Sequence, residues 1–335
     1  MQTSILGNPD CPFGPFLEEG DTHCFEPLSS QGYETLSENH PNLDAWLADV
    51  RHVGFDVTPT MQGVPTLPAF IADVGGGNGK VLTDTSPNFA ATTIDRVVSP
   101  YTLKVQPDVH SVAGLPRRTT IIVNGYAEDT FLEKLWPARF EVAASLAKLD
   151  CIFTAPDYSV FLQQPHAERL INIKRSLIFF ELLQRFGARA IPTMHWTGLK
   201  DLQRWAHWIN SHLSIGVIAL DLQMLTGYLW LLVLEQLRAF VAMLDRPIHF
   251  VVTGPSTPAR IGQVRSVLKS VSVISAGPLQ AAIRHRRLNL TVFDRISRDD
   301  SALSPSKLFS LNLELMHKIC LRPVGQTALL SQVRG

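Results

Sequence analysis

The chain has 335 residues, of which 45% are hydrophobic and 18% are charged, and its formal net charge is zero. This composition excludes global disorder, and the length fits either one barrel with an extension or two ordinary domains. The most hydrophobic stretch, 224–243, carries Glu235 and Arg238, so it predicts a buried helix and no membrane span. The N-terminus lacks a basic segment and an apolar core, so we expect no secretion signal.

Residues 1–60 are rich in Pro, Gly, Ser and Asn, with one predicted helix at 43–53, and we expect an irregular extension that wraps the main domain. From residue 67 a pattern repeats: a short apolar run ends in a polar or glycine-rich tip, and a helical stretch follows. Buried apolar strands that alternate with helices indicate a parallel sheet. Strands are predicted at 67–71, 120–123, 151–154, 188–191, 215–220, 248–252 and 271–274, with a weaker eighth at 288–293.

These units in series predict an α/β fold, a (β/α)8 TIM-barrel-like domain at 61–300 that is either complete or distorted. The segment 75–116 is long for a connection between a strand and its helix, so we interpret it as an insertion beside the barrel mouth. Its glycine run at 75–79 lacks the pattern of a phosphate-binding loop and predicts a turn or hairpin. A helix and tail are expected at 301–335. The other helices are predicted at 129–148, 167–186, 199–212, 229–245, 258–270 and 279–286.

Two aspartates at strand ends are the main catalytic candidates, since the chemistry of such barrels lies at the C-terminal ends of the strands. Asp157 follows a buried strand and could act as a base, as a nucleophile or as a partner for a developing cation; capping a turn is its alternative role. Asp221 ends another strand, and Gln223 shares its side. The pair suits recognition of a nucleobase edge, or Asp221 bonds to backbone in a turn.

Further strand-end residues are candidates for substrate binding. His195, beside Trp196, could exchange protons or stack on a base, or it is a core histidine. The other candidates are Asp73, Asn124, Tyr126 and Tyr158.

Arg169, Asn172 and Arg175 share a face of the helix after Asp157 and could line the mouth or hold phosphate, but we interpret that face as solvated. The cluster of Trp196, Trp205 and Trp208 is interpreted as core packing.

Charge is distributed unevenly along the chain. Residues 1–150 hold 9 Lys and Arg against 19 Asp and Glu, whereas residues 151–335 hold 21 against 11. A basic half can mark a nucleic-acid footprint, or the two halves neutralise each other across the fold. The candidates for phosphate binding are Arg260, Arg265, Arg284, Arg286 and Arg287.

The four cysteines are too few and too scattered for a disulfide framework, which favours a reducing, cytoplasmic setting. Cys11 and Cys24 lie near His23, but their spacing matches no closed zinc motif, and a metal there stays an open question. No cofactor is predicted.

The segment 151–196 carries a spaced pattern: P-D-Y-S at 156–159, Pro165, N-x-x-R at 172–175 and G-x-x-x-I-P-x-x-x-W at 187–196. In these roughly forty residues the chain resembles an uncharacterised, often phage-associated family.

Motifs at two predicted strand ends also resemble those of a known superfamily. Asp157 and Phe161 keep an Asp-x-x-x-Phe strand end, and VVTGPSTPARIG keeps a strand end, a glycine and a helix begun by proline. In these features the chain is similar to the tRNA-guanine transglycosylase superfamily and its DNA-acting relatives. It departs from them where Tyr158, Ser159 and Val160 replace the family's Ser-Gly-Gly, and where residues 275–277 (SAG) replace its nucleophilic aspartate. The family's C-terminal cysteine-rich zinc site is missing as well.

The resemblance implies chemistry at an N-glycosidic bond, and the absent nucleophile favours hydrolysis over base exchange. We expect a DNA glycosylase-type enzyme that removes a modified, phage-derived base in antiviral defence, with DNA as the partner and without a membrane. Asp157 would stabilise the sugar cation or activate water, while Asp221, Gln223, Asn124 and His195 read a flipped base. The alternatives are a tRNA or DNA base transglycosylase, a non-catalytic nucleic-acid-binding barrel, and a lyase or hydrolase of small molecules.

Overall fold

The computed structural model describes residues 49–50, 54–75, 87–160, 166–223, 225, 227–291 and 295–323. Eight of its strands pair in parallel and form one sheet in the order β5-β4-β3-β2-β1-β8-β7-β6. These strands are β1 (Phe70–Asp73), β2 (Phe89–Thr93), β3 (Thr120–Asn124), β4 (Ile152–Thr154), β5 (Arg189–Ile191), β6 (Val217–Asp221), β7 (His249–Thr253) and β8 (Val271–Ser275).

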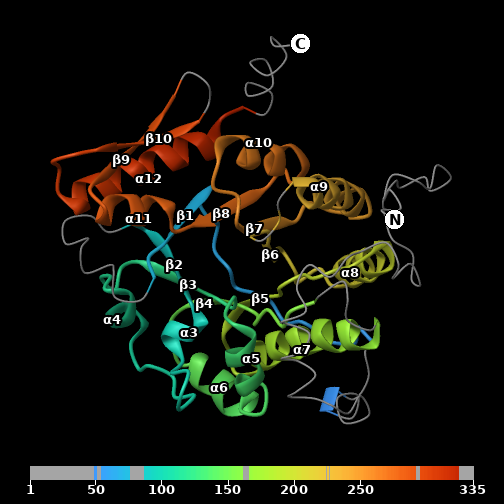
Figure 1. Cartoon of the computed structure of the whole chain (residues 1–335). Coiled ribbons are helices and arrows are strands. Elements are labelled where there is room, and N and C mark those ends of the chain that lie inside the picture. Colours follow the sequence, from blue (N-terminus) through green and yellow to red (C-terminus); the bar gives the residue numbers. More distant parts are fainter. Residues whose placement is uncertain are drawn as a thin grey trace, which may run out of the picture.

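The two outer strands of this sheet, β5 and β6, also meet. Thr193, just beyond β5, bridges to Ala219 of β6, and the amide of Ala219 donates to the carbonyl of Pro192 at 2.9 Å. The strands therefore form a nearly closed barrel and follow one another around it in chain order (Figure 1). The predicted TIM-barrel-like α/β fold is confirmed.

One strand of the barrel lies where the sequence predicted an insertion. β2 forms within 75–116 and pairs with β1 on one side and β3 on the other. Its sequence, FAATT, has one large apolar residue, the partly exposed Phe89, and the small side chains of Ala90, Ala91 and Thr92 are fully buried. The strand expected at 288–293 is wrong as a barrel strand, because β9 (Arg286–Leu290) pairs antiparallel with β10 (Ile296–Asp300) in a separate sheet.

Helices follow the strands and cover the barrel from outside. The predicted helix at 129–148 is divided at Pro137, whose ring cannot supply an amide to a continuous helix. The start of α10 is as expected, with Thr257 accepting a hydrogen bond from the Arg260 amide at 3.3 Å. The helices are α3 (Ile94–Val97), α4 (Val109–Ala113), α5 (Asp129–Leu135), α6 (Arg139–Leu146), α7 (His166–Arg185), α8 (Leu199–Ser211), α9 (Gly227–Ala242), α10 (Pro258–Val267), α11 (Gly277–Ile283) and α12 (Pro305–Leu321).

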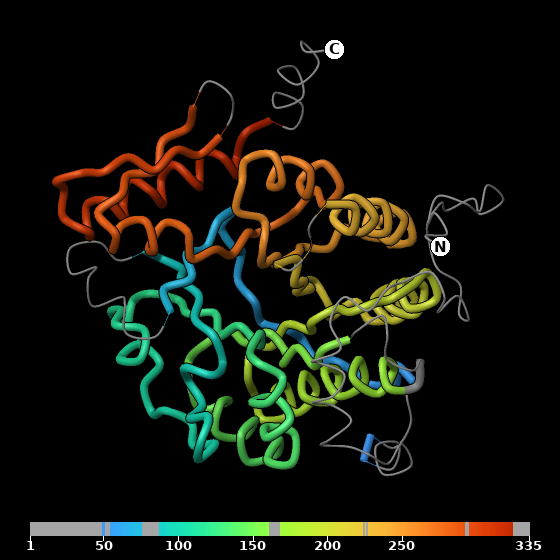
Figure 2. The backbone as a smooth tube through the Cα atoms, viewed as in Figure 1, coloured from blue at the N-terminus to red at the C-terminus, as the bar shows by residue number. Residues whose placement is uncertain are grey.

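The C-terminal elements form a unit on one side of the barrel. The hairpin of β9 and β10 packs against α11 and α12 (Figure 2, orange to red). The buried amide of Leu288 donates to Asn312 Oδ1 of α12 at 2.7 Å, and Asn312 Nδ2 donates to the carbonyl of Arg286 at 3.1 Å. Asn312 thereby fixes the first strand of the hairpin to the terminal helix.

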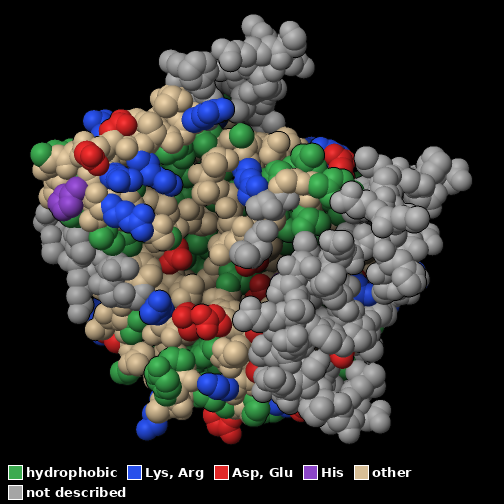
Figure 3. Space-filling view, in the orientation of Figure 1, with side chains coloured by type: hydrophobic (Ala, Val, Ile, Leu, Met, Phe, Trp, Pro, Cys, Tyr) green, Lys and Arg blue, Asp and Glu red, His purple; other side chains and the backbone are tan. Residues whose placement is uncertain are grey.

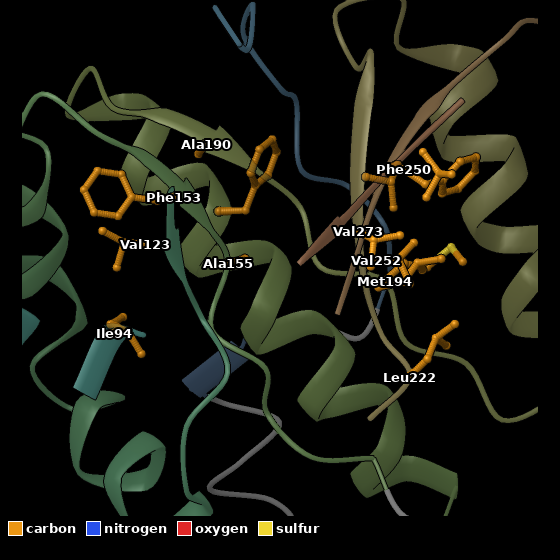
Figure 4. Packing of buried hydrophobic residues seen from close by; sticks show 14 of the residues in the cluster. Ile94, Val123, Phe153, Ala155, Ala190, Met194, Leu222, Phe250, Val252 and Val273 are labelled. Atoms are coloured by element: carbon orange, nitrogen blue, oxygen red, sulfur yellow. The ribbon is translucent and has the colours of Figure 1, made fainter. Parts of the chain in front are cut away.

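Two apolar layers hold the barrel together. An inner cluster includes Ile71, Ile122, Ile152, Ile191 and Val251, one from each of five strands. The outward-facing side chains of the same strands pack against the helices, as Figure 4 shows for part of this outer cluster. Because side chains alternate along a strand, the residue two positions after each inner one also faces the barrel axis. At the C-terminal ends these inward positions are polar: Asp73, Thr93, Asn124, Thr154, Thr193, Asp221 and Thr253.

At the opposite end, the side chain of Gln62 joins β5 to β6. Its Nε2 donates to the carbonyls of Ala190, at 3.3 Å, and Val217, at 2.9 Å. Its Oε1 accepts from the amides of Gly216, at 2.7 Å, and Val217, at 2.8 Å. One glutamine thus satisfies backbone groups of both strands at the place where direct pairing between them is least extensive.

Candidate active site

An ion pair at the C-terminal end of the barrel joins Asp157 and His195. Asp157 follows β4, His195 follows β5, and His195 Nε2 lies 2.8 Å from Asp157 Oδ1. The two side chains are only 16% and 14% exposed. Burial, the largest single cause, lowers the pKa of His195, but the charge of Asp157, its hydrogen bond to the imidazole and the charge of Asp221 together raise the pKa. The contact therefore favours an imidazolium that holds a carboxylate.

Asp221 is a second carboxyl group at the C-terminal end of the barrel. It lies at the end of β6, where its Oδ1 accepts from the Gln223 amide at 2.8 Å. Burial, reinforced by the charge of Asp157, raises the pKa of Asp221 to about 7. Near neutral pH a substantial fraction of Asp221 is thus protonated. The site combines a proton donor with an anion paired to histidine, which is the arrangement that acid-base catalysis needs.

Tyr126 places a phenol beside both carboxyl groups. Burial raises the pKa of this phenol well above its ordinary value, and the charges of Asp221 and Asp157 raise it further. The side chain is 8% exposed, and its hydroxyl has no hydrogen-bond partner among the described residues. Tyr126 therefore remains a neutral phenol whose hydroxyl is not engaged by this part of the protein.

A polar bridge beneath these groups crosses the barrel, formed by Thr154, Asn124 and Thr253. Thr154 donates to Asn124 Oδ1 at 2.9 Å, and Asn124 Nδ2 donates to Thr253 Oγ1 at 3.1 Å. The bridge connects β4, β3 and β7, and Thr253 is the register partner of Asp221. Asn124 is fully buried, so the structure gives this candidate base reader a bracing role.

Two glycines let the strand ends approach closely enough to build the site. A Cβ on Gly125 would lie 2.2 Å from the carbonyl oxygen of Ala155, and a Cβ on Gly254 would lie 2.5 Å from the amide nitrogen of Gln223. Both distances are far too short for any side chain. The carbonyl of Gly125 also accepts from the Asp157 amide at 3.1 Å. The lack of a side chain at Gly125 and Gly254 therefore allows the close backbone contacts beside Asp157 and Asp221.

The loop that carries Asp157 is fastened from below by α7. Asn172 Nδ2 donates to the carbonyl of Ser159 at 2.8 Å, and Ser176 Oγ donates to that of Pro156 at 2.8 Å. Arg175 forms a two-pronged ion pair with Glu133 of α5, at 2.7 and 2.9 Å. The solvated face predicted for this helix is wrong for Asn172 and Arg175, which are buried; the motifs P-D-Y-S and N-x-x-R meet in space as one support.

The remaining candidates have different surroundings. Tyr158 is buried in the core, with the Arg175 guanidinium 4.1 Å from its ring centre, and so supports the loop away from the mouth. Gln223 is exposed beside Asp221. Asp73 accepts from the Gly75 amide at 3.0 Å, and burial and then the charge of Asp95 raise its pKa. Trp205 and Trp208 pack edge to face at 5.6 Å, which confirms core packing for that pair.

Sequence reasoning missed the supporting residues of this site, Glu133, Ser176, Thr154 and Thr253. Thr154 and Thr253 each occupy an inward strand-end position, and that alternation was a readable signal. Glu133 and Ser176 gave none, because their partners lie 42 and 20 residues away along the chain.

The basic candidates lie mainly on the C-terminal unit. Arg284, Arg286 and Arg287 are exposed, and Arg286 is 3.7 Å from Asp300. Arg260 lies over the Trp230 ring at 4.5 Å, while Arg265 donates to the carbonyl of Arg322. Figure 3 shows basic side chains gathered over β9, β10 and α11, beside a central hollow that contains acidic side chains.

Several features of the sequence lie outside the described residues: Cys11, His23, Cys24, Phe161 and most of the glycine run. Within the described ranges, no group of three or more His, Cys, Asp or Glu side chains could hold a metal ion. No helix of that same part is long and apolar enough to cross a membrane.

Comparison with models of known protein families gives no match, and comparison with curated protein sequences gives none either. Function therefore has to be argued from the site itself.

Proposed function

We propose that the chain hydrolyses the N-glycosidic bond of a nucleobase, with DNA as the favoured substrate. The observation that carries this proposal is the placement of two carboxyl groups at the strand ends: Asp157, with an oxygen 2.8 Å from His195 Nε2, and Asp221, whose pKa burial and the charge of Asp157 raise to about 7. Cleavage of a glycosidic bond uses one carboxylic acid to protonate the leaving group and one carboxylate to assist at the sugar.

Each residue has a defined part in this reaction. Asp221 donates its proton to a nitrogen of the leaving base as the bond from the base to the sugar C1′ breaks and its electrons pass to the base. The Asp157 carboxylate stabilises the positive charge that develops on the sugar, and His195 keeps that carboxylate in place. Water then adds to C1′ and gives its proton to Asp157, which leaves a free base and an abasic sugar.

The nucleic-acid part of the proposal rests on the exposed arginines of the hairpin region. Arg284, Arg286 and Arg287 lie on a unit beside the barrel, where they could contact phosphates without reading sequence. A base inside a duplex must be flipped out to reach a barrel mouth, at a cost of a few kcal/mol. The resemblance to a phage-associated family extends the proposal to a modified base of phage DNA and a role in defence.

The test is to incubate the protein with unmodified DNA and with base-modified phage DNA, and then to treat both with alkali, which breaks abasic strands. We expect breaks with the wild type, and a loss of about a hundredfold or more with Asp221→Asn and with Asp157→Asn. Uptake of a labelled free base into the DNA would instead indicate base exchange. If no DNA breaks under any condition, the proposal is wrong.

A further inference from the structure

The buried hydroxyl of Tyr126 has no hydrogen-bond partner in the part of the protein that the structure describes. Tyr126 is only 8% exposed. A buried hydroxyl without a partner lowers stability, because it gives up its bonds to water and gains nothing in return. At a site open to substrate, a ligand can supply the missing partner of such a group.

The backbone determines where this hydroxyl lies. Tyr126 follows Gly125, whose carbonyl accepts from the Asp157 amide, and Asn124, whose side chain is tied across the barrel to Thr253. The strand end of β3 is thus fixed to the strand ends that carry Asp157 and Asp221. The charges of both carboxylates act on the phenol, which agrees with this placement.

We propose that Tyr126 is a specificity-determining residue whose hydroxyl donates a hydrogen bond to an acceptor on the ligand, beside the atom that Asp221 protonates. The ligand class is an uncharged heterocyclic base with two acceptors on one edge, either ring nitrogens or carbonyl oxygens. This inference rests on the proposed function and adds the donor pattern by which the same site selects its base.

The charge of the site determines which part of a nucleotide enters it. Asp157, Asp221 and Asp73 are all at strand ends, and His195 is already paired with Asp157. An anionic phosphate would be repelled there, whereas a neutral base edge accepts bonds from a phenol and a carboxylic acid. The phosphate contacts of the substrate must therefore lie elsewhere.

A change of Tyr126→Phe removes one oxygen and keeps the ring, so it separates a role in folding from a role in binding. We expect its melting temperature to equal or exceed that of the wild type, since the lost hydroxyl has no partner in the described protein. Tyr158→Phe is the matched control, because the Tyr158 hydroxyl is also buried and unpartnered among the described residues but lies in the core. A fall of several degrees for Tyr126→Phe alone would give the hydroxyl a structural role and overturn the inference.

Binding is measured by thermal shift and by quenching of tryptophan fluorescence, with the four deoxynucleosides, deoxyinosine and their free bases as probes. We expect at least one probe to bind the wild type and Tyr158→Phe equally, and Tyr126→Phe at least tenfold more weakly. Equal binding by Tyr126→Phe, or no binding of any probe to the wild type, overturns the inference. Abasic-site formation in DNA is scored separately with Asp221→Asn, so failure of the proposed function is recognised independently.

Discussion

Asn124 of β3 donates a hydrogen bond of 3.1 Å to Thr253 of β7, across the barrel from one half of the sheet to the other. Three strands lie between β3 and β7 in either direction around the barrel, so this bond is not part of the strand pairing. It links the side of the mouth that carries Asp157 to the side that carries Asp221. The bond therefore contributes to the relative position of the two carboxyl groups.

Replacing Thr253 by Val should leave the buried amide of Asn124 without its acceptor. We expect a loss of about 1–3 kcal/mol in the free energy of unfolding, measured by urea titration, because a buried donor without a partner keeps its full desolvation cost. DNA cleavage should fall as well. Thr253→Ser is the matched control, since it keeps the hydroxyl and should retain most of both properties. Equal behaviour of the Val and Ser variants would show that the bond does not brace the site.

Asp221 should make the wild type less stable as the pH rises. Its pKa is about 7 in the folded protein, above its ordinary value of 3.8. Between these values the folded state binds more protons than the unfolded state, so the free energy of unfolding falls as the pH increases from about 4 to 7 and this contribution is constant above. Asp221→Asn lacks this penalty and keeps an oxygen for the Gln223 amide.

We therefore expect Asp221→Asn to gain stability over the wild type as the pH rises, by a few kcal/mol at pH 8, and to show little difference at pH 4. Thermal melts at intervals of one pH unit measure the difference. At the same time the variant should lose abasic-site formation. A stability difference that is independent of pH would contradict the raised pKa.

Arg175 and Glu133 offer a prediction about the support beneath Asp157. Their side chains are 2% and 4% exposed, and Arg175→Met would leave the Glu133 carboxylate without this partner. We expect the free energy of unfolding, measured by urea titration, to fall by about 3–5 kcal/mol. Removing one member of a buried ion pair takes away the opposite charge that compensates the other. The double change Arg175→Met with Glu133→Leu should recover most of that loss. A double variant as unstable as the single one would contradict this account.

Much of the barrel could be predicted because its strands are short, buried and rich in large apolar residues, as in 120–123 and 248–252. β2 was not predicted as a strand because its buried residues are alanine and threonine. These small side chains fit the barrel but do not form a run of large apolar residues. The strand expected at 288–293 had the right local pattern, and only its pairing partner, β10, shows that it belongs to a hairpin. Pairing is a long-range property that local patterns do not contain.

In the candidate site, too, local patterns predicted some residues, whereas contacts between distant parts of the chain could not be predicted. Their place at predicted strand ends indicated Asp157, Asp221 and His195, although the contact between His195 and Asp157 joins residues 38 positions apart and needed the fold. The burial of Arg175 could not be predicted, since a charged residue on a helix normally faces water unless a partner such as Glu133 comes from elsewhere in the chain.

Gln62 gives a prediction for the seam between β5 and β6. Gln62→Met keeps the length of the side chain but removes its four hydrogen bonds to Ala190, Gly216 and Val217. We expect a loss of about 3 kcal/mol, as several buried backbone groups lose partners.

Hydrogen exchange locates this effect along the strand. The amides of Gly216 and Val217 should exchange faster in Gln62→Met, whereas the Leu222 amide, bonded to Thr253 at the far end of β6, should change less. Gln62→Glu is the matched control, because its carboxylate still accepts from both amides while the two bonds donated by Nε2 are lost, so it should lie between Met and the wild type. If Gly216 and Val217 exchange at unchanged rates in Gln62→Met, strand pairing alone holds the seam and Gln62 is dispensable there.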